Sequence, residues 1–109
     1  MSLGHYILED RQPVRVDLMT WARWMEEHRI DRIVAKWDYK LGEVSTVFLG
    51  LDHQWDPDGP PLLFETMVFG GIEDGYCDRY TTWREAEQGH MEVCQRIRDQ
   101  LRHVPVEGG

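Results

Sequence analysis

Two apolar, β-favouring runs constrain the fold of this chain more than any other feature of its sequence. Val44 to Leu51 and Leu62 to Phe69 are rich in β-branched and aromatic residues, and a proline-rich acidic loop, Asp52 to Pro61, joins them. Runs of this composition that are bounded by Gly and Pro are typical of β-strands. One carboxylate, Glu65, lies within the second run. We therefore expect a small sheet that contains one chemically discordant residue.

The N-terminal part of the chain predicts a hairpin followed by a helix. Tyr6 to Val16 holds two β-favouring pieces around a polar turn, with Pro13 tolerable only on an edge strand. Asp17 is a favourable N-cap for a helix that should reach about His28. Apolar residues recur there at helical spacing and predict one buried stripe, formed by Leu18, Trp21, Ala22 and Met25.

The alternation of side chains predicts which residues share a face of the sheet. Ile33 to Tyr39 alternates with period two and adds a further strand. If the turns lie at the Gly and Pro residues, one face carries Ile33, Ala35, Trp37, Tyr39, Val44, Thr46, Phe48, Leu63, Glu65, Met67 and Phe69. The other face carries Val47, Leu49, Leu62, Phe64 and Val68. Because this second face is too apolar for full exposure, we expect a homodimer or another protein partner to hide it.

A long C-terminal helix completes the predicted domain. Tyr76 to Tyr80 predicts a short edge strand, and Thr82 with Glu85 forms a capping box that starts a helix reaching about His103. Its predicted buried stripe consists of Trp83, Ala86, His90, Val93, Cys94, Ile97 and Leu101. We therefore predict one α+β domain over residues 1–109, with an antiparallel sheet of about four to five strands and two helices packed on one face.

Charge and cysteine content exclude several classes of function. Twelve basic and twenty acidic residues leave a formal charge of −8, which would repel a nucleic acid duplex. Neither a signal peptide nor an apolar run long enough to span a membrane is evident. Cys77 and Cys94 are too few for a disulfide framework or a zinc site. This composition favours a cytoplasmic protein without a membrane segment, metal or other cofactor.

Glu65 and His90 are candidate partners because each is a polar group expected at an apolar interface. A buried carboxylate needs a partner or a route to water, and His90 faces inward on the C-terminal helix. We therefore expect a hydrogen bond between them. It would fix the register of sheet and helix, or, in the functional alternative, form an acid/base pair.

The Asp52 to Pro61 loop is a second candidate site. Five residues come close to the spacing of a calcium-binding loop: Gln54, Asp56, Asp58, Gly59 and Glu65. Prolines within the loop and its continuation into a strand argue against that interpretation. Recognition through exposed side chains is more consistent with a long loop on a rigid scaffold. The candidate binding residues are His53, Trp55, Asp56, Glu65 and His90.

Several segments together resemble a known group of proteins. They are His5–Leu8, Asp17–Ala22, Ser45–His53, Gly59–Gly71, Arg79–Tyr80 and Thr82–Trp83, with Glu87, Gly89 and His90. The chain thereby resembles small uncharacterised proteins encoded by tailed bacteriophages and prophages of proteobacteria. The resemblance implies a phage origin and action inside an infected bacterium. It implies no activity and therefore assigns no catalytic residue.

These observations favour a non-enzymatic interaction protein that binds a host or phage protein, with inhibition of a host process as one candidate role. The sequence offers no nucleophile elbow, phosphate-binding loop or HExxH spacing. The alternatives are a small hydrolase or a metal- or nucleotide-binding enzyme that uses Glu65, His90 and His53, and a virion or assembly component.

Overall fold

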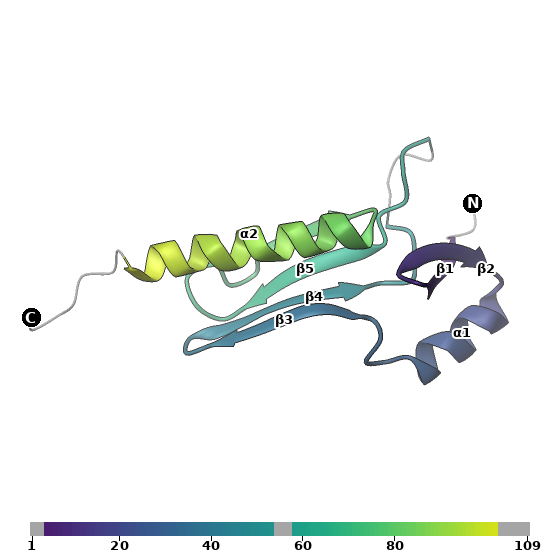
Figure 1. Cartoon of the computed structure of the whole chain (residues 1–109), viewed down its shortest axis with the longest axis horizontal. Coiled ribbons are helices and arrows are strands. Elements are labelled where there is room, and N and C mark those ends of the chain that lie inside the picture. The colour runs from purple at the N-terminus through teal and green to yellow at the C-terminus, as the bar shows by residue number, and fades with distance from the viewer. Residues whose placement is uncertain (1–3, 54–57, 103–109) are drawn as a thin grey trace, which may run out of the picture.

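The chain folds as an α+β structure, as the sequence predicts. The computed structural model describes residues 4–53 and 58–102 (Figure 1). Its elements are β1 His5–Glu9, β2 Gln12–Val16, α1 Leu18–Glu27, β3 Ile33–Tyr39, β4 Gly42–Phe48, β5 Phe64–Phe69, β6 Cys77–Tyr80 and α2 Trp83–Arg102. Within the described ranges, β1 and β2 form a two-stranded sheet, and the other strands form an antiparallel sheet in the order β3-β4-β5-β6.

The N-terminal hairpin and α1 lie at one end of the larger sheet (Figure 1). The Asp17 side chain caps α1 by accepting a hydrogen bond from the Thr20 amide at 2.8 Å. The buried stripe of α1 differs from the predicted one, because Leu18 is 56% exposed whereas Trp21, Trp24 and Met25 are half-buried. α1 packs mainly against β1, and Trp24 reaches the core edge-on to Phe48, with a centroid distance of 5.8 Å.

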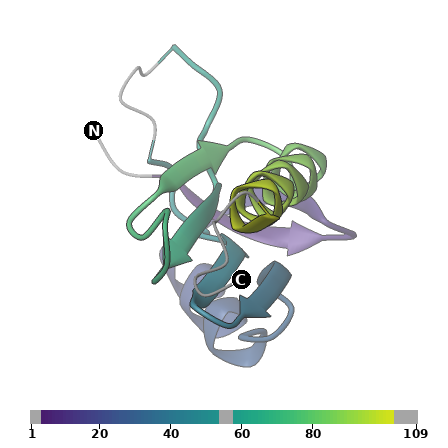
Figure 2. The same cartoon turned by 90° about the vertical axis from the view of Figure 1, so that its left-hand side faces the viewer.

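Helix α2 covers one face of the four-stranded sheet (Figures 1 and 2). The capping box predicted at its start is confirmed: the Glu85 amide donates to Thr82 Oγ1 at 3.1 Å, and the Thr82 amide donates to Glu85 Oε1 at 3.1 Å. The predicted stripe is also largely confirmed, since the buried residues of α2 are Ala86, Gly89, His90, Val93, Cys94 and Ile97.

The register between β4 and β5 differs from the predicted one. Val44 pairs with Val68, Thr46 with Thr66 and Phe48 with Phe64, so these six residues share the face beneath α2. The prediction placed Glu65, Met67 and Phe69 there, which is wrong by one residue. A slip of one residue exchanges the two faces of a strand completely. The observed register buries two apolar side chains and places Glu65, whose side chain is 15% exposed, beside Arg79, which avoids burying an unpaired carboxylate beneath α2.

A bulge makes a similar change in β3. Ala35, Trp37 and Tyr39 lie on the helix-covered face as predicted, but the register shifts between Ile33 and Ala35. Ile33 therefore pairs with Val47 on the opposite face and is 42% exposed. β-Bulges insert one extra residue and so reverse the alternation of side chains.

Neither helix in the described residues is long and apolar enough to cross a membrane.

Gly89 provides a test of the packing between α2 and β6. A Cβ atom at Gly89 would overlap the Tyr80 ring and hydroxyl. Alanine is otherwise about 1 kcal/mol more favourable than glycine inside a helix. We expect Gly89→Ala to lower the free energy of unfolding by about 1–3 kcal/mol, as overpacking does, in urea denaturation. Gln88→Ala, at an exposed neighbouring position, should be neutral or stabilising. A more stable Gly89→Ala protein would contradict the observed Tyr80 placement.

Candidate interaction surface

The structure separates the residues that the sequence singled out. Glu65 and His90 lie on opposite faces of the sheet, so the expected hydrogen bond between them is wrong. Arg79 Nε donates to Glu65 Oε2 at 3.0 Å, whereas His90 contacts Thr46 beneath α2. His53 is exposed. Trp55 and Asp56 lie outside the described residues, as does the part of the predicted calcium loop around them.

His90 ends a chain of hydrogen bonds buried between sheet and helix. Its Nδ1 lies 2.8 Å from Thr46 Oγ1, and Thr46 Oγ1 lies 2.6 Å from Thr66 Oγ1. The Tyr80 hydroxyl donates to Thr66 Oγ1 at 3.2 Å. Both threonines are fully buried, and His90 is only 7% exposed. This polar layer separates two apolar clusters, one around Val44, Val68 and Ile97 and the other around Phe48, Leu63 and Phe64.

The direction of this chain determines the state of the imidazole. Tyr80 donates to Thr66, and in a chain that continues in the same direction the Thr66 hydroxyl donates to Thr46 and the Thr46 hydroxyl donates to Nδ1 of His90. His90 is then neutral, with its proton on Nε2. Burial, aided by the Arg98 charge, lowers the pKa of His90 and supports the neutral form. Because Thr46 is inaccessible, its hydroxyl cannot meet a substrate, and the layer stabilises the fold instead of performing nucleophilic catalysis.

The face of the sheet opposite α2 carries both apolar and charged side chains. We call it the open face, because among the described elements α2 packs on the other side and α1 packs against β1. The pairing of the strands places on it Ile33, Lys36, Asp38, Glu43, Ser45, Val47, Glu65, Met67, Phe69, Cys77 and Arg79. Phe69 is 50% exposed, and Val47 and Met67 are half-buried by their neighbours. An uncovered apolar strip of this kind is typical of a protein-binding surface.

Charges on the open face are largely compensated within it. Arg79 pairs with Glu65, and Lys36 Nζ lies 3.7 Å from Glu43 Oε1. With Asp38, the face therefore carries two cations and three carboxylates, a formal charge of −1, while the whole chain carries −8. A near-neutral, partly apolar face is easier to desolvate than the acidic remainder of the surface.

Two corrections to the predicted interface follow from this arrangement. Phe64 and Val68, expected on a dimer face with Val47 and Leu49, are fully buried beneath α2. Val47 lies on the open face as predicted, and Met67 and Phe69 join it there. The sequence did contain the relevant signal: placing Glu65 at the solvent selects the register in which Met67 and Phe69 are exposed with it.

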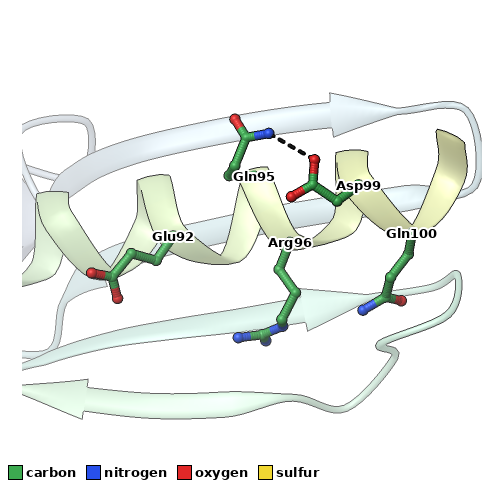
Figure 3. A pocket seen from close by; sticks show the side chains of 5 residues that line it. All are labelled: Glu92, Gln95, Arg96, Asp99 and Gln100. Carbon is green, nitrogen blue, oxygen red and sulfur yellow. Dashed lines mark hydrogen bonds between the residues drawn. The ribbon is translucent and has the colours of Figure 1, made fainter.

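An open hollow of about 520 Å³ along α2 is lined by Glu92, Gln95, Arg96, Asp99 and Gln100 (Figure 3). Its polar groups already have local partners. Arg96 Nε donates to Glu73 Oε2 at 2.7 Å, and Gln100 donates to the same oxygen at 2.9 Å. The Arg96 guanidinium holds the pKa of Glu73 below its usual range. This cluster therefore clamps the turn between β5 and β6 onto α2, and it offers no free convergent set of polar groups.

A second hollow, of about 440 Å³, lies between the hairpin, α1 and the start of α2. Trp24 stacks on His28 at 4.7 Å in its wall, and the Arg11 guanidinium lies 4.9 Å from the Trp83 ring centroid. Arg11 has a φ of 65°, a left-handed conformation that is uncommon for a residue with a side chain. The rim carries charges of both signs, so its chemistry selects no particular class of ligand.

The buried imidazole predicts a pH dependence of stability. The folded state holds His90 neutral, with a pKa below the usual 6.5. Between the two pKa values the unfolded chain binds a proton that the folded chain does not, so acid favours unfolding there. The contribution of the neutral imidazole is fully present above pH 6.5 and is lost as the pH falls through the folded pKa. We expect urea denaturation to show a lower free energy of unfolding at about pH 5 than at about pH 7.

Two variants test whether His90 causes this pH dependence. His90→Gln should be less stable at neutral pH, and its stability should depend less on pH in this window. His53→Gln, at an exposed histidine, should keep the wild-type dependence. An unchanged slope for His90→Gln would assign the acid sensitivity to another group.

Neither a metal cluster nor a relative supplies a function. No group of three or more His, Cys, Asp or Glu side chains that could hold a metal ion occurs within residues 4–53 and 58–102. Comparison with protein-family models, with curated proteins and with solved structures finds no match for this chain. The functional evidence for this protein therefore consists of the chemistry of its own surfaces.

Proposed function

We propose that this chain is a small phage-encoded interaction protein that binds a host or phage protein through the open face in the bacterial cytoplasm. The observation that carries the proposal is the apolar strip of exposed Phe69 and half-buried Val47 and Met67 between internally paired charges. The resemblance to phage and prophage proteins supports the biological setting. Interference with a host process is a role that such binding would serve.

The charge distribution suggests the chemistry of the partner. A flat apolar centre on the partner would match the strip of the open face. A basic surround would complement the remaining charge of this acidic chain and accelerate the encounter. We therefore propose a protein partner with an exposed apolar patch inside a positively charged region.

The enzymatic alternative lacks a comparable arrangement. Glu65 lies on the open face, His90 lies beneath α2, and His53 is exposed in the segment that follows β4. General acid/base chemistry requires these groups within hydrogen-bond reach of one substrate. The sheet separates Glu65 from His90, so these two groups cannot act together on one substrate.

The proposal is tested with a matched pair of methionine substitutions. Met67 lies at the centre of the open face, whereas Met91 is 64% exposed on α2. We expect Met67→Glu to reduce the recovery of a specific partner from infected host cells by about tenfold or more, as loss of a central contact does. Quantitative mass spectrometry after affinity purification measures this recovery.

Met91→Glu adds the same charge elsewhere and should leave recovery unchanged. Circular dichroism should show that both variants remain folded. Equal recovery with wild type and Met67→Glu, or equal loss in both variants, would exclude the open face as the binding surface. Mass spectrometry of purified phage particles would identify a partner that belongs to the virion.

A further inference from the structure

The outer edge of β3 is a second unpaired surface, which adjoins the open face along Lys36 and Asp38. β3 ends the order β3-β4-β5-β6, and no strand of the described residues pairs with its outer side. α1 lies beyond the Ile33 end, and α2 lies over the face of the sheet (Figures 1 and 2). The unpaired amide and carbonyl groups of such an edge are a template for another strand.

The regular part of β3 carries two charges of opposite sign at equal distances from its central residue. The bulge lies between Ile33 and Ala35, so the undistorted segment is Ala35–Tyr39, with Trp37 at its middle. Lys36 and Asp38 are both exposed and stand on either side of Trp37, on the open-face side of the strand. A two-fold axis through Trp37 would bring Lys36 opposite Asp38 of a second copy, and Asp38 opposite its Lys36.

We propose that a second copy of this chain docks on the β3 edge by antiparallel β3–β3 pairing centred on Trp37. Two symmetric Lys36–Asp38 pairs then form, and cross-strand pairs of opposite charge stabilise a ladder whereas like pairs destabilise it. Each protomer supplies the same surface, as two-fold symmetry requires. The result is an eight-stranded sheet with both α2 helices on one side.

The Lys36–Glu43 ion pair within each protomer would compete only weakly with the proposed pairing. Lys36 approaches Glu43 only at 3.7 Å, with its side chain 49% exposed, and exposed pairs of this kind are weak. Charges on an edge commonly prevent pairing. Here the two charges are opposite in sign and equally distant from Trp37. In the antiparallel register each charge therefore faces an opposite charge of the second copy, and the pairing is attractive. On the helix side, Trp37 stacks on Tyr39 at 4.8 Å and would face Trp37 of the second copy, which is a favourable aromatic cross-strand pair.

The pairing does not depend on the function proposed for the open face. Both open faces would lie on the same side of the extended sheet and remain accessible. Open-face variants away from β3, such as Met67→Glu, should therefore leave self-association intact.

Charge reversal and double reversal test the proposed dimer. We expect the full-length wild-type chain to show a concentration-dependent dimer by analytical ultracentrifugation at low salt. Lys36→Asp or Asp38→Lys alone turns both attractive pairs into repulsive ones and should weaken dimerisation by about tenfold or more. The double variant Lys36→Asp/Asp38→Lys restores opposite charges across the axis and should recover the dimer.

Each outcome decides the proposal. A wild-type chain that stays monomeric at high concentration would overturn it, as would single variants that dimerise normally or a double variant that fails to recover. Both single variants also change the charge next to Glu43, which pairs with Asp38 across the strands and lies near Lys36, so the two are compared with each other and with the double variant. Should a variant unfold, hydrogen exchange of the wild type gives a second test: those amides of Ala35–Tyr39 that point away from β4 should gain protection as the protein concentration rises, and unchanged protection would overturn the dimer.

Discussion

The hydrogen-bonded layer of Thr46, Thr66, His90 and Tyr80 is the constraint on which the rest of the structure depends. Tyr80 donates to Thr66, and further hydrogen bonds join Thr66 to Thr46 and Thr46 to Nδ1 of His90, so each member of the chain has a partner within it. A buried donor or acceptor without a partner costs about 1–3 kcal/mol. A slip of one residue between β4 and β5 would break the layer and place Glu65 beneath α2. The layer therefore selects one register where apolar packing alone would be less specific.

Local signals in the sequence predicted the elements well. The capping box at Thr82 and the apolar spacing of α2 depend only on residues within a turn or two, and both are present as expected. The hairpin of β1 and β2 and the N-cap at Asp17 are local in the same sense. Such features need no knowledge of distant contacts, because the groups that interact are neighbours in the chain.

The candidate site was predicted less well because its faces depend on non-local pairing. A long loop separates β4 from β5, so no tight turn determined their register. Alternation alone could not show which residues of β5 share a face with Val44 and Phe48. The bulge near Ile33 reversed the alternation of side chains a second time, because it inserts an extra residue in β3. The sequence correctly indicated that Glu65 and His90 each need a partner. It did not show that these partners are Arg79 and Thr46, on opposite sides of the sheet.

The same register determines which surfaces the protein can use. With the threonines beneath α2, alternation sends Glu65 and Met67 to the open face, and Arg79 neutralises the carboxylate there. The alternation of side chains along β3 likewise places Lys36 and Asp38 on the open face, opposite the aromatic pair formed by Trp37 and Tyr39. The edge therefore has an aromatic side, where the Arg98 guanidinium lies 4.4 Å from the Trp37 ring centroid, and a side that carries Lys36 and Asp38. Antiparallel self-pairing would bring each side against the same side of a second copy. A partner bound to the open face and a second copy bound to the edge would occupy adjoining but separate parts of one sheet.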